Sequence, residues 1–227
     1  SCTCVGKILI CQGTLNVMLN FAKVLILTSS NDSNTKTMTH LKKMSLLVSL
    51  EISHSPLFSI PNNAFLNNGH LLSLNLSHNI ISTIFQQSFN SLLRLTFLNL
   101  CNNTLVYLPS MSFKHLKSLK YFHLCNNMIK MLVRKNFFGL SLLEFLNLSG
   151  NQIKSITNDV FVDLPELREI DIEFNSLYFV AKDVFDNLHN LNLIMTDDVL
   201  FYCKYSHLVP KLSKDNFEER KCQSILY

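Results

Sequence analysis

The sequence is poor in glycine and in charge, and both shortages exclude classes of function. Only five of its 227 residues are glycine, and 16% are charged, against roughly 25% in ordinary globular domains. There is no glycine-rich phosphate-binding loop, no Gly-x-Ser-x-Gly turn and no His-Glu-x-x-His motif. We therefore expect no enzyme, with no catalytic residues, no cofactor and no bound metal.

Long apolar runs and a strong net charge are also missing. No run reaches the roughly 18 apolar residues of a membrane span, and the net charge of +4 is too small to indicate nucleic acid binding. The chain opens at Ser1 without a secretory signal, which suggests a processed form or a fragment. Because 48% of the residues are hydrophobic, we expect apolar side chains to be buried along the whole chain.

What the sequence does contain is a repeat. A pair of apolar residues with one residue between them recurs every 24 residues, at Leu50/Ile52, Leu74/Leu76, Leu98/Leu100, Phe122/Leu124, Leu146/Leu148 and Ile170/Ile172. An Asn follows five of these pairs, and a Phe closes each unit, from Phe65 to Phe185. This is the Leu-x-x-Leu-x-Leu-x-x-Asn-x-Leu pattern of the leucine-rich repeat. A less regular repeat with Leu25 and Leu27 precedes it.

The spacing predicts an α/β solenoid. Alternation points both leucines of each pair inward from a short strand, and neighbouring repeats should join these strands into a curved sheet, parallel and concave. The convex side should be irregular or short-helical, with the Asn side chains bonding to backbone at the turns. We expect an N-terminal cysteine cap over residues 1–21 and about eight repeats over 22–198. A C-terminal cap, or the start of a hinge, should follow over 199–227.

The cysteines at the two ends indicate an oxidising compartment. Cys2, Cys4 and Cys11 precede the first repeat, and Cys203 and Cys222 follow the last. We interpret both groups as disulfide-bonded caps, which predicts an extracellular protein, either secreted or part of a cell surface. The first group resembles the N-terminal cap of extracellular leucine-rich-repeat proteins. That cap normally carries four cysteines, so we expect a truncated one. A zinc site there would lack a well-spaced fourth ligand.

Cys101 and Cys125 occupy the same position in successive repeats. Their Cα atoms should lie about 4.8 Å apart, which permits a disulfide. Lateral neighbours on a parallel sheet, however, point their side chains side by side and strain such a bridge. We favour two free thiols on the concave face, with the disulfide as the alternative.

Four sequons mark glycosylation candidates at Asn31, Asn75, Asn102 and Asn147. Asn31 is preferred because it lies in the polar stretch 29–39, which we expect to be a loop. Asn75 and Asn147 stand in Leu-Asn-Leu-Ser, a sequence that the repeat itself tends to generate.

Residues that flank the inward leucines should line the concave face. The middle strands are neutral, polar and aromatic there, whereas the last three carry six acids and one base, a net charge of −5. The candidate ligand-binding residues are Glu144, Phe145, Glu169, Asp171, Glu173, Phe174, Asp197 and Asp198. A solvated charged face is the alternative. His54 and His78 should stack laterally, and we favour a surface pair over a metal site.

One segment indicates a more specific class of leucine-rich-repeat protein. It runs from Leu191 to Pro210 and contains Phe201-Tyr-Cys203. It resembles the start of the hinge in leucine-rich-repeat-containing G protein-coupled receptors, especially the relaxin-receptor branch. That resemblance implies an ectodomain that binds a basic peptide hormone, with Glu169 and Asp171 binding arginine side chains of the hormone. Leu212 stands where the family usually has a further Cys. An adhesion or matrix protein and a pattern-recognition receptor are the other classes.

Overall fold

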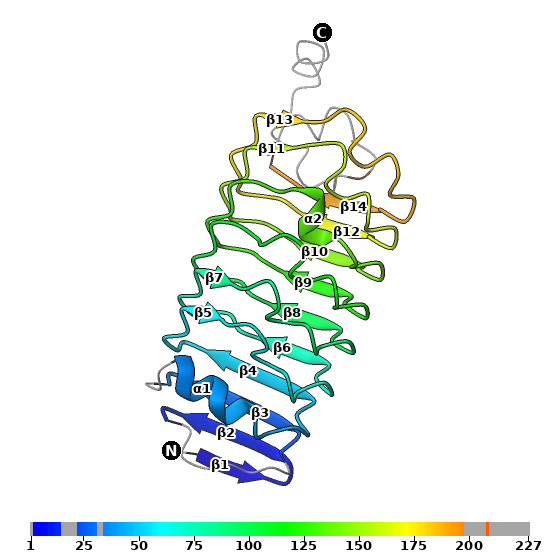
Figure 1. Cartoon of the computed structure of the whole chain (residues 1–227). Coiled ribbons are helices and arrows are strands. Elements are labelled where there is room, and N and C mark those ends of the chain that lie inside the picture. Colours follow the sequence, from blue (N-terminus) through cyan, green and yellow to red (C-terminus); the bar gives the residue numbers. More distant parts are fainter. Residues whose placement is uncertain (1, 15–21, 31–33, 198–207, 209–227) are drawn as a thin grey trace.

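The computed structural model describes residues 2–14, 22–30, 34–197 and 208. Its main feature is one sheet of ten strands in which all neighbours are parallel except the first pair (Figure 1). In sheet order the strands are β1 (Cys2–Val5), β2 (Ile8–Gln12), β3 (Val24–Thr28), β4 (Ser49–Ser53), β6 (Ser73–Asn75), β8 (Phe97–Asn99), β9 (Tyr121–His123), β10 (Phe145–Asn147), β12 (Glu169–Asp171) and β14 (Leu193–Met195). Leu50 lies beside Leu74, and Leu74 beside Leu98, so the register advances by one repeat per strand, as the spacing predicted.

The opposite side of the solenoid has little regular structure. Two short parallel pairs lie there, β5 (Ser59–Ile60) with β7 (Thr83–Ile84) and β11 (Ser155–Ile156) with β13 (Phe179–Val180). The two described helices are α1 (Asn34–Leu41) and α2 (Arg134–Phe137). Figure 1 shows these short strands across from the large sheet, with the chain winding between the two sides. The predicted leucine-rich-repeat solenoid, with an irregular convex side, is therefore confirmed.

The core is a continuous column of buried side chains between the two sides. Both apolar residues of each strand pair are buried, and so is the Phe that closes each unit. Neighbouring Phe rings stack along the column, with centroids 6.0 Å apart for Phe65–Phe89 and 5.5 Å apart for Phe89–Phe113. Such a column stabilises each repeat through its neighbours, because a single repeat cannot bury its own apolar face.

A second column is made by the Asn side chains that follow the strands. The Asn103 amide donates to the carbonyls of Leu100 in its own turn and Leu76 in the preceding repeat, both at 3.0 Å. Its oxygen accepts the Ile81 N–H at 2.9 Å. Asn79, Asn127, Asn151 and Asn175 make similar bonds, which satisfies backbone groups that the turns would leave unpaired. The predicted structural role of these Asn residues is confirmed.

The turns that leave the strands share a left-handed residue. Positive φ angles between 49° and 64° recur there, at Ser29, His54, His78, Asn102, Asn126, Gly150 and Phe174. The His54 and His78 rings stack in this column with centroids 4.7 Å apart. Among the described residues, no three His, Cys, Asp or Glu side chains gather closely enough to hold a metal ion.

One prediction about the cysteines was wrong. Cys101 and Cys125 form a disulfide, with Cα atoms 4.5 Å apart. Free thiols were favoured because a pleated sheet would hold these two side chains side by side. Both cysteines instead lie two residues beyond the ends of β8 and β9, where the chain is already turning.

The ends of the chain give a mixed result. Cys2 and Cys11 form a disulfide across the antiparallel β1–β2 pair, whereas Cys4 is exposed and free. The stretch 29–39 is not all loop, because its residues from 34 onward belong to α1, where Thr37 and Met38 are buried. The predictions on Asn31, Asp198, Cys203 and Cys222 fall outside the described residues.

Candidate functional site

The one-repeat register arranges the concave side chains in rows across the strands. One row runs Tyr121, Phe145, Glu169 and Leu193, on β9, β10, β12 and β14. The next row runs His123, Asn147, Asp171 and Met195 on the same strands. The structure therefore brings together the predicted residues Phe145, Glu169 and Asp171, and it adds apolar side chains beside the acids.

An aromatic cluster adjoins the acidic strands. His123 packs between Phe97 and Phe145, with ring centroids 5.2 Å and 5.1 Å away. Burial lowers the pKa of His123 from its ordinary value, which favours the neutral imidazole. Tyr121 lies between Phe97 and Phe145 in the row across the strands, and 45% of its surface is exposed. We name Phe97, Tyr121, His123 and Phe145 the aromatic cluster.

The sequence predicted polar and aromatic side chains on the middle strands of the concave face, but Phe97, Tyr121 and His123 were not among the candidate ligand-binding residues. The register of the repeats could have revealed this cluster. Tyr121 lies in one row with Phe97 and Phe145, on β8, β9 and β10. His123 stands two residues after Tyr121, and its ring lies between the rings of Phe97 and Phe145.

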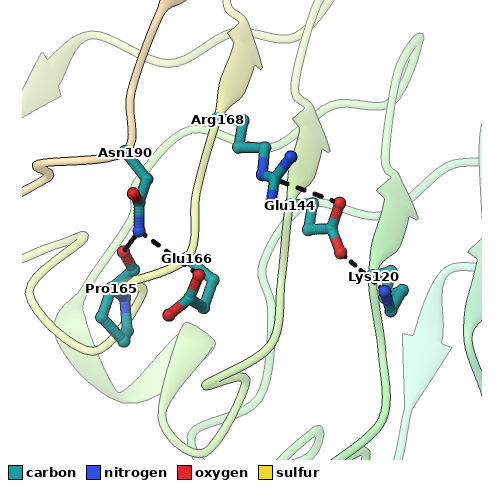
Figure 2. Close-up of polar contacts among 6 residues, drawn as sticks. All are labelled: Lys120, Glu144, Pro165, Glu166, Arg168 and Asn190. Carbon is teal, nitrogen blue, oxygen red and sulfur yellow. Dashed lines mark hydrogen bonds and ion pairs between the residues drawn. The ribbon is translucent and has the colours of Figure 1, made fainter.

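Glu144 lies at the edge where the chain enters the concave strands, and it has cationic partners. Lys120 Nζ lies 2.7 Å from Glu144 Oε1, and Arg168 Nε lies 3.8 Å from Glu144 Oε2. Figure 2 shows the two cationic side chains on either side of the carboxylate. The hydrogen bond from Lys120 lowers the pKa of Glu144, and the same bond raises the pKa of Lys120. The charge of Glu144 is thus compensated within the protein, unlike the charges of the predicted site acids on the later strands.

Four of the predicted site carboxylates make no ion pair with any described residue: Glu169, Asp171, Glu173 and Asp197. We name these four the acidic patch. Burial raises the pKa of Glu173, and the charges of Asp171 and Asp197 raise it further. Asp171 and Asp197 are therefore close enough to Glu173 to repel its charge, which favours a bound cationic group.

Two members of the acidic patch also support the backbone. Asp171 is 8% exposed, and its Oδ1 accepts the Glu173 N–H at 3.1 Å. The side-chain oxygens of Asn75, Asn99 and Asn147 accept the equivalent N–H in earlier repeats. Asp197 accepts the Phe174 N–H at 3.1 Å through Oδ2. Each aspartate thus uses one carboxylate oxygen for the fold, and no described residue bonds to the other oxygen.

Phe174 stands at the rim of the acidic patch in an unusual conformation. Its φ is +55° and 70% of its surface is exposed. The left-handed region disfavours bulky side chains, and strained residues of this kind cluster at functional sites. An exposed aromatic ring held there is a candidate contact for a ligand.

The chain belongs to the leucine-rich-repeat family, whose model matches residues 45–105, 94–153 and 148–197. Proteins of this fold are typically non-enzymatic interaction modules. No curated protein matches the chain significantly. None of the helices in the described segments has the length and apolar character needed to cross a membrane.

Solved structures share the fold. The chain is similar to TLR13 in its complex with ssRNA13, with 25% identity and a TM-score of 0.66, over 78% of this chain and 29% of TLR13. It is also similar to a leucine-rich-repeat protein of Leptospira interrogans, with 24% identity and a TM-score of 0.66, over 78% of this chain and 43% of that protein. The chain therefore spans less than half the length of either structure.

Proposed function

We propose that this chain is the ligand-binding region of an extracellular receptor and that its ligand is a basic peptide or protein with exposed apolar groups. The observation that carries the proposal is the adjacency of the acidic patch and the aromatic cluster on one concave surface. The first supplies uncompensated negative charge, and the second supplies rigid apolar contacts. Charged and aromatic groups together provide both steering and anchoring at interfaces.

The geometry suggests how such a ligand would bind. The fork of an arginine guanidinium can bond to Glu169 and to the second oxygen of Asp171, and charge-assisted bonds of this kind are the stronger ones. Apolar groups of the ligand would contact Phe145 and Phe174, together with Leu193 and Met195 at the last described strand. Catalysis forms no part of this proposal.

The extracellular setting and the rest of the protein are part of the same proposal. The two disulfides in the described part of the chain favour an oxidising compartment. We propose that in the full-length protein the chain couples to a G protein-coupled transmembrane domain, as the hinge-like segment from Leu191 to Pro210 implies. A basic peptide hormone would then be the ligand.

A pattern-recognition receptor is the second candidate, favoured by the similarity to TLR13. A nucleic acid ligand would meet the acidic patch with its own phosphate charges, which is unfavourable on this part of the concave face. We rank the peptide ligand first for this reason. An adhesion or matrix protein would use the same surface for a protein partner.

The test is a selection of displayed random peptides on the immobilised chain. We expect the recovered peptides to combine Arg or Lys with apolar residues, and to lose binding to the double variant Glu169→Gln/Asp171→Asn. Asparagine already serves the backbone role of position 171 in three other repeats, so this variant should fold. The control is Lys42→Gln/Lys43→Gln. Acidic peptides, or equal binding to the acidic double variant and the parent, would reject the proposal.

A further inference from the structure

A second concave feature lies at the other end of the solenoid, at the edge where the chain enters the first strands. A pocket of about 300 Å³ is lined by Lys23, Leu46, Val48, His70, Leu72 and Arg94. These residues stand one to three positions before β3, β4, β6 and β8, so the pocket crosses several repeats. Figure 1 shows these strands toward the N-terminal end of the solenoid. Its size matches the lower range of sites for small ligands.

The floor of the pocket includes two apolar residues in a row of this edge that is polar in later repeats. Val48 and Leu72 occupy the row that continues with Thr96, Lys120, Glu144 and Arg168 in later repeats. Leu46 adds a large apolar side chain that is 48% exposed. Val48 and Leu72, in a row that is otherwise polar, form with Leu46 a local apolar surface on which a ligand can gain from burial.

The rim of the pocket is basic and lacks acidic partners. Lys23, His70 and Arg94 are exposed, and neither Lys23 nor Arg94 makes an ion pair with any residue in the described part of the chain. Further along the same edge, Lys120 and Arg168 share the carboxylate of Glu144. The two unpaired cations therefore distinguish the pocket from the rest of the edge.

The backbone of the pocket is fixed before any ligand arrives. The Lys23 carbonyl accepts N–H groups from Val48 and Ser49, at 2.7 Å and 3.0 Å. The Val48 carbonyl accepts those of Leu72 and Ser73, at 2.8 Å and 3.2 Å. A preformed site avoids the entropy cost of ordering its walls on binding.

From these features we infer a second binding site that takes a carboxylate carried on a short apolar body. The carboxylate bonds to Arg94 and Lys23, and the apolar body lies on Leu46, Val48 and Leu72. Two sources have this chemistry, namely a free aliphatic acid and the C-terminal carboxylate of a peptide that ends in an apolar residue. The inference is independent of the acidic patch, which has the opposite charge.

The test is a titration followed by NMR of the Leu46, Val48 and Leu72 methyl groups. The two probes are octanoate and an acetylated tripeptide that ends in Leu with a free carboxylate. We expect saturable shifts from at least one probe, and the tighter of the two identifies the source. The uncharged controls, octanol and the amide of the same peptide, should bind about threefold to fivefold more weakly.

Variants separate the two halves of the site. Arg94→Gln and Lys23→Gln should each weaken binding about threefold to fivefold, as expected for a partly exposed ion pair. Val48→Thr/Leu72→Thr should weaken binding by removing the apolar floor, and Thr96 shows that this row accepts threonine. Lys130→Gln, on an exposed lysine outside the pocket, is the matched control. No saturable shift from either probe, uncharged controls that bind as well as the acids, or equal effects of Lys130→Gln and Arg94→Gln would overturn the inference.

Discussion

Phe174 departs most from the pattern of its own structural column. The other left-handed residues of that column are Ser, His, Asn or Gly, which accept positive φ more readily than a bulky aromatic residue does. Phe174 is also 70% exposed, so burial contributes little to compensate for the strain. A side chain that costs stability and stays exposed is best explained by a contact made outside the chain.

Replacing Phe174 should therefore improve stability and weaken binding. We expect Phe174→Asn to stabilise the chain by about 0.5–1 kcal/mol, because Asn tolerates this backbone conformation. Binding of peptides selected on the parent chain should weaken by about 1–2 kcal/mol. Thermal melting and equilibrium titration measure the two effects. Tyr178→Asn, at another exposed aromatic residue, is the control and should change neither quantity in this way.

Glu173 should make stability depend on pH. Burial and the neighbouring acids raise its pKa in the folded protein, so its ionised form destabilises the fold above that pKa. We expect Glu173→Gln to stabilise the protein at neutral pH by less than about 1 kcal/mol. The gain should shrink as pH falls through the raised pKa and vanish below the usual pKa of glutamate. Melting curves at several pH values would contradict this if the gain grew in acid.

Residue types alone predicted which side chains would line the concave face, but not how each would be used. The strand alternation placed Phe145, Glu169 and Asp171 correctly on neighbouring strands. The double use of Asp171, and the pairing of Glu144 with Lys120 and Arg168, depend on side-chain torsions that a repeat pattern does not fix. The register predicts which residues, 24 apart in sequence, are neighbours on adjacent strands. It does not predict which of their side chains form contacts.

At the scale of the element, the Asn column should carry much of the stability of each turn. The Asn127 amide donates to the carbonyls of Leu100 and Leu124, and its oxygen accepts the Leu105 N–H. We expect Asn127→Ala to destabilise the chain by about 3 kcal/mol, because several buried backbone groups lose their partners. Gln152→Ala, at an exposed position, should cost less than about 0.5 kcal/mol. Equal midpoints in urea for the two variants would contradict this role.

The disulfide between the β8 and β9 repeats should stabilise the middle of the solenoid. Closing a loop of 24 residues is worth about 3 kcal/mol in the chain-entropy description. Cys101→Ser/Cys125→Ser should lose about that much, and Ser77 and Ser149 show that serine suits this repeat position. Reductant should destabilise the parent more than this variant, whose one remaining bridge among the described residues is Cys2–Cys11. The same loss with reductant in both proteins would show that Cys101–Cys125 contributes nothing.

Elements that repeat could be predicted, and elements that do not repeat could not. The strands and their register follow from the recurrence of the leucine pairs, because any other register would expose them. Helix α1 lies in the irregular first repeat. The polar sequence there gave no sign that Thr37 and Met38 would be buried. The disulfide was missed because its two positions lie just past the strands, where pleat geometry no longer applies.

At the scale of the whole molecule, charge is unevenly distributed. The chain carries +4 overall, yet the acidic patch at the C-terminal end of the concave face has no cationic partner among the described residues. A basic ligand would be steered toward that end, and salt would weaken the steering. Steering of this kind changes the rate of association more than the rate of dissociation.

The central claim, that the acidic patch receives a basic ligand, is tested most directly by stopped-flow association at increasing salt. The probe is a peptide that combines Arg and apolar residues, selected on the parent chain. We predict that its association rate falls steeply with salt for the parent and for Lys130→Gln. For Glu169→Gln/Asp171→Asn the rate should be lower at low salt and nearly independent of salt. The same salt dependence in the parent and in the acidic double variant would contradict the account.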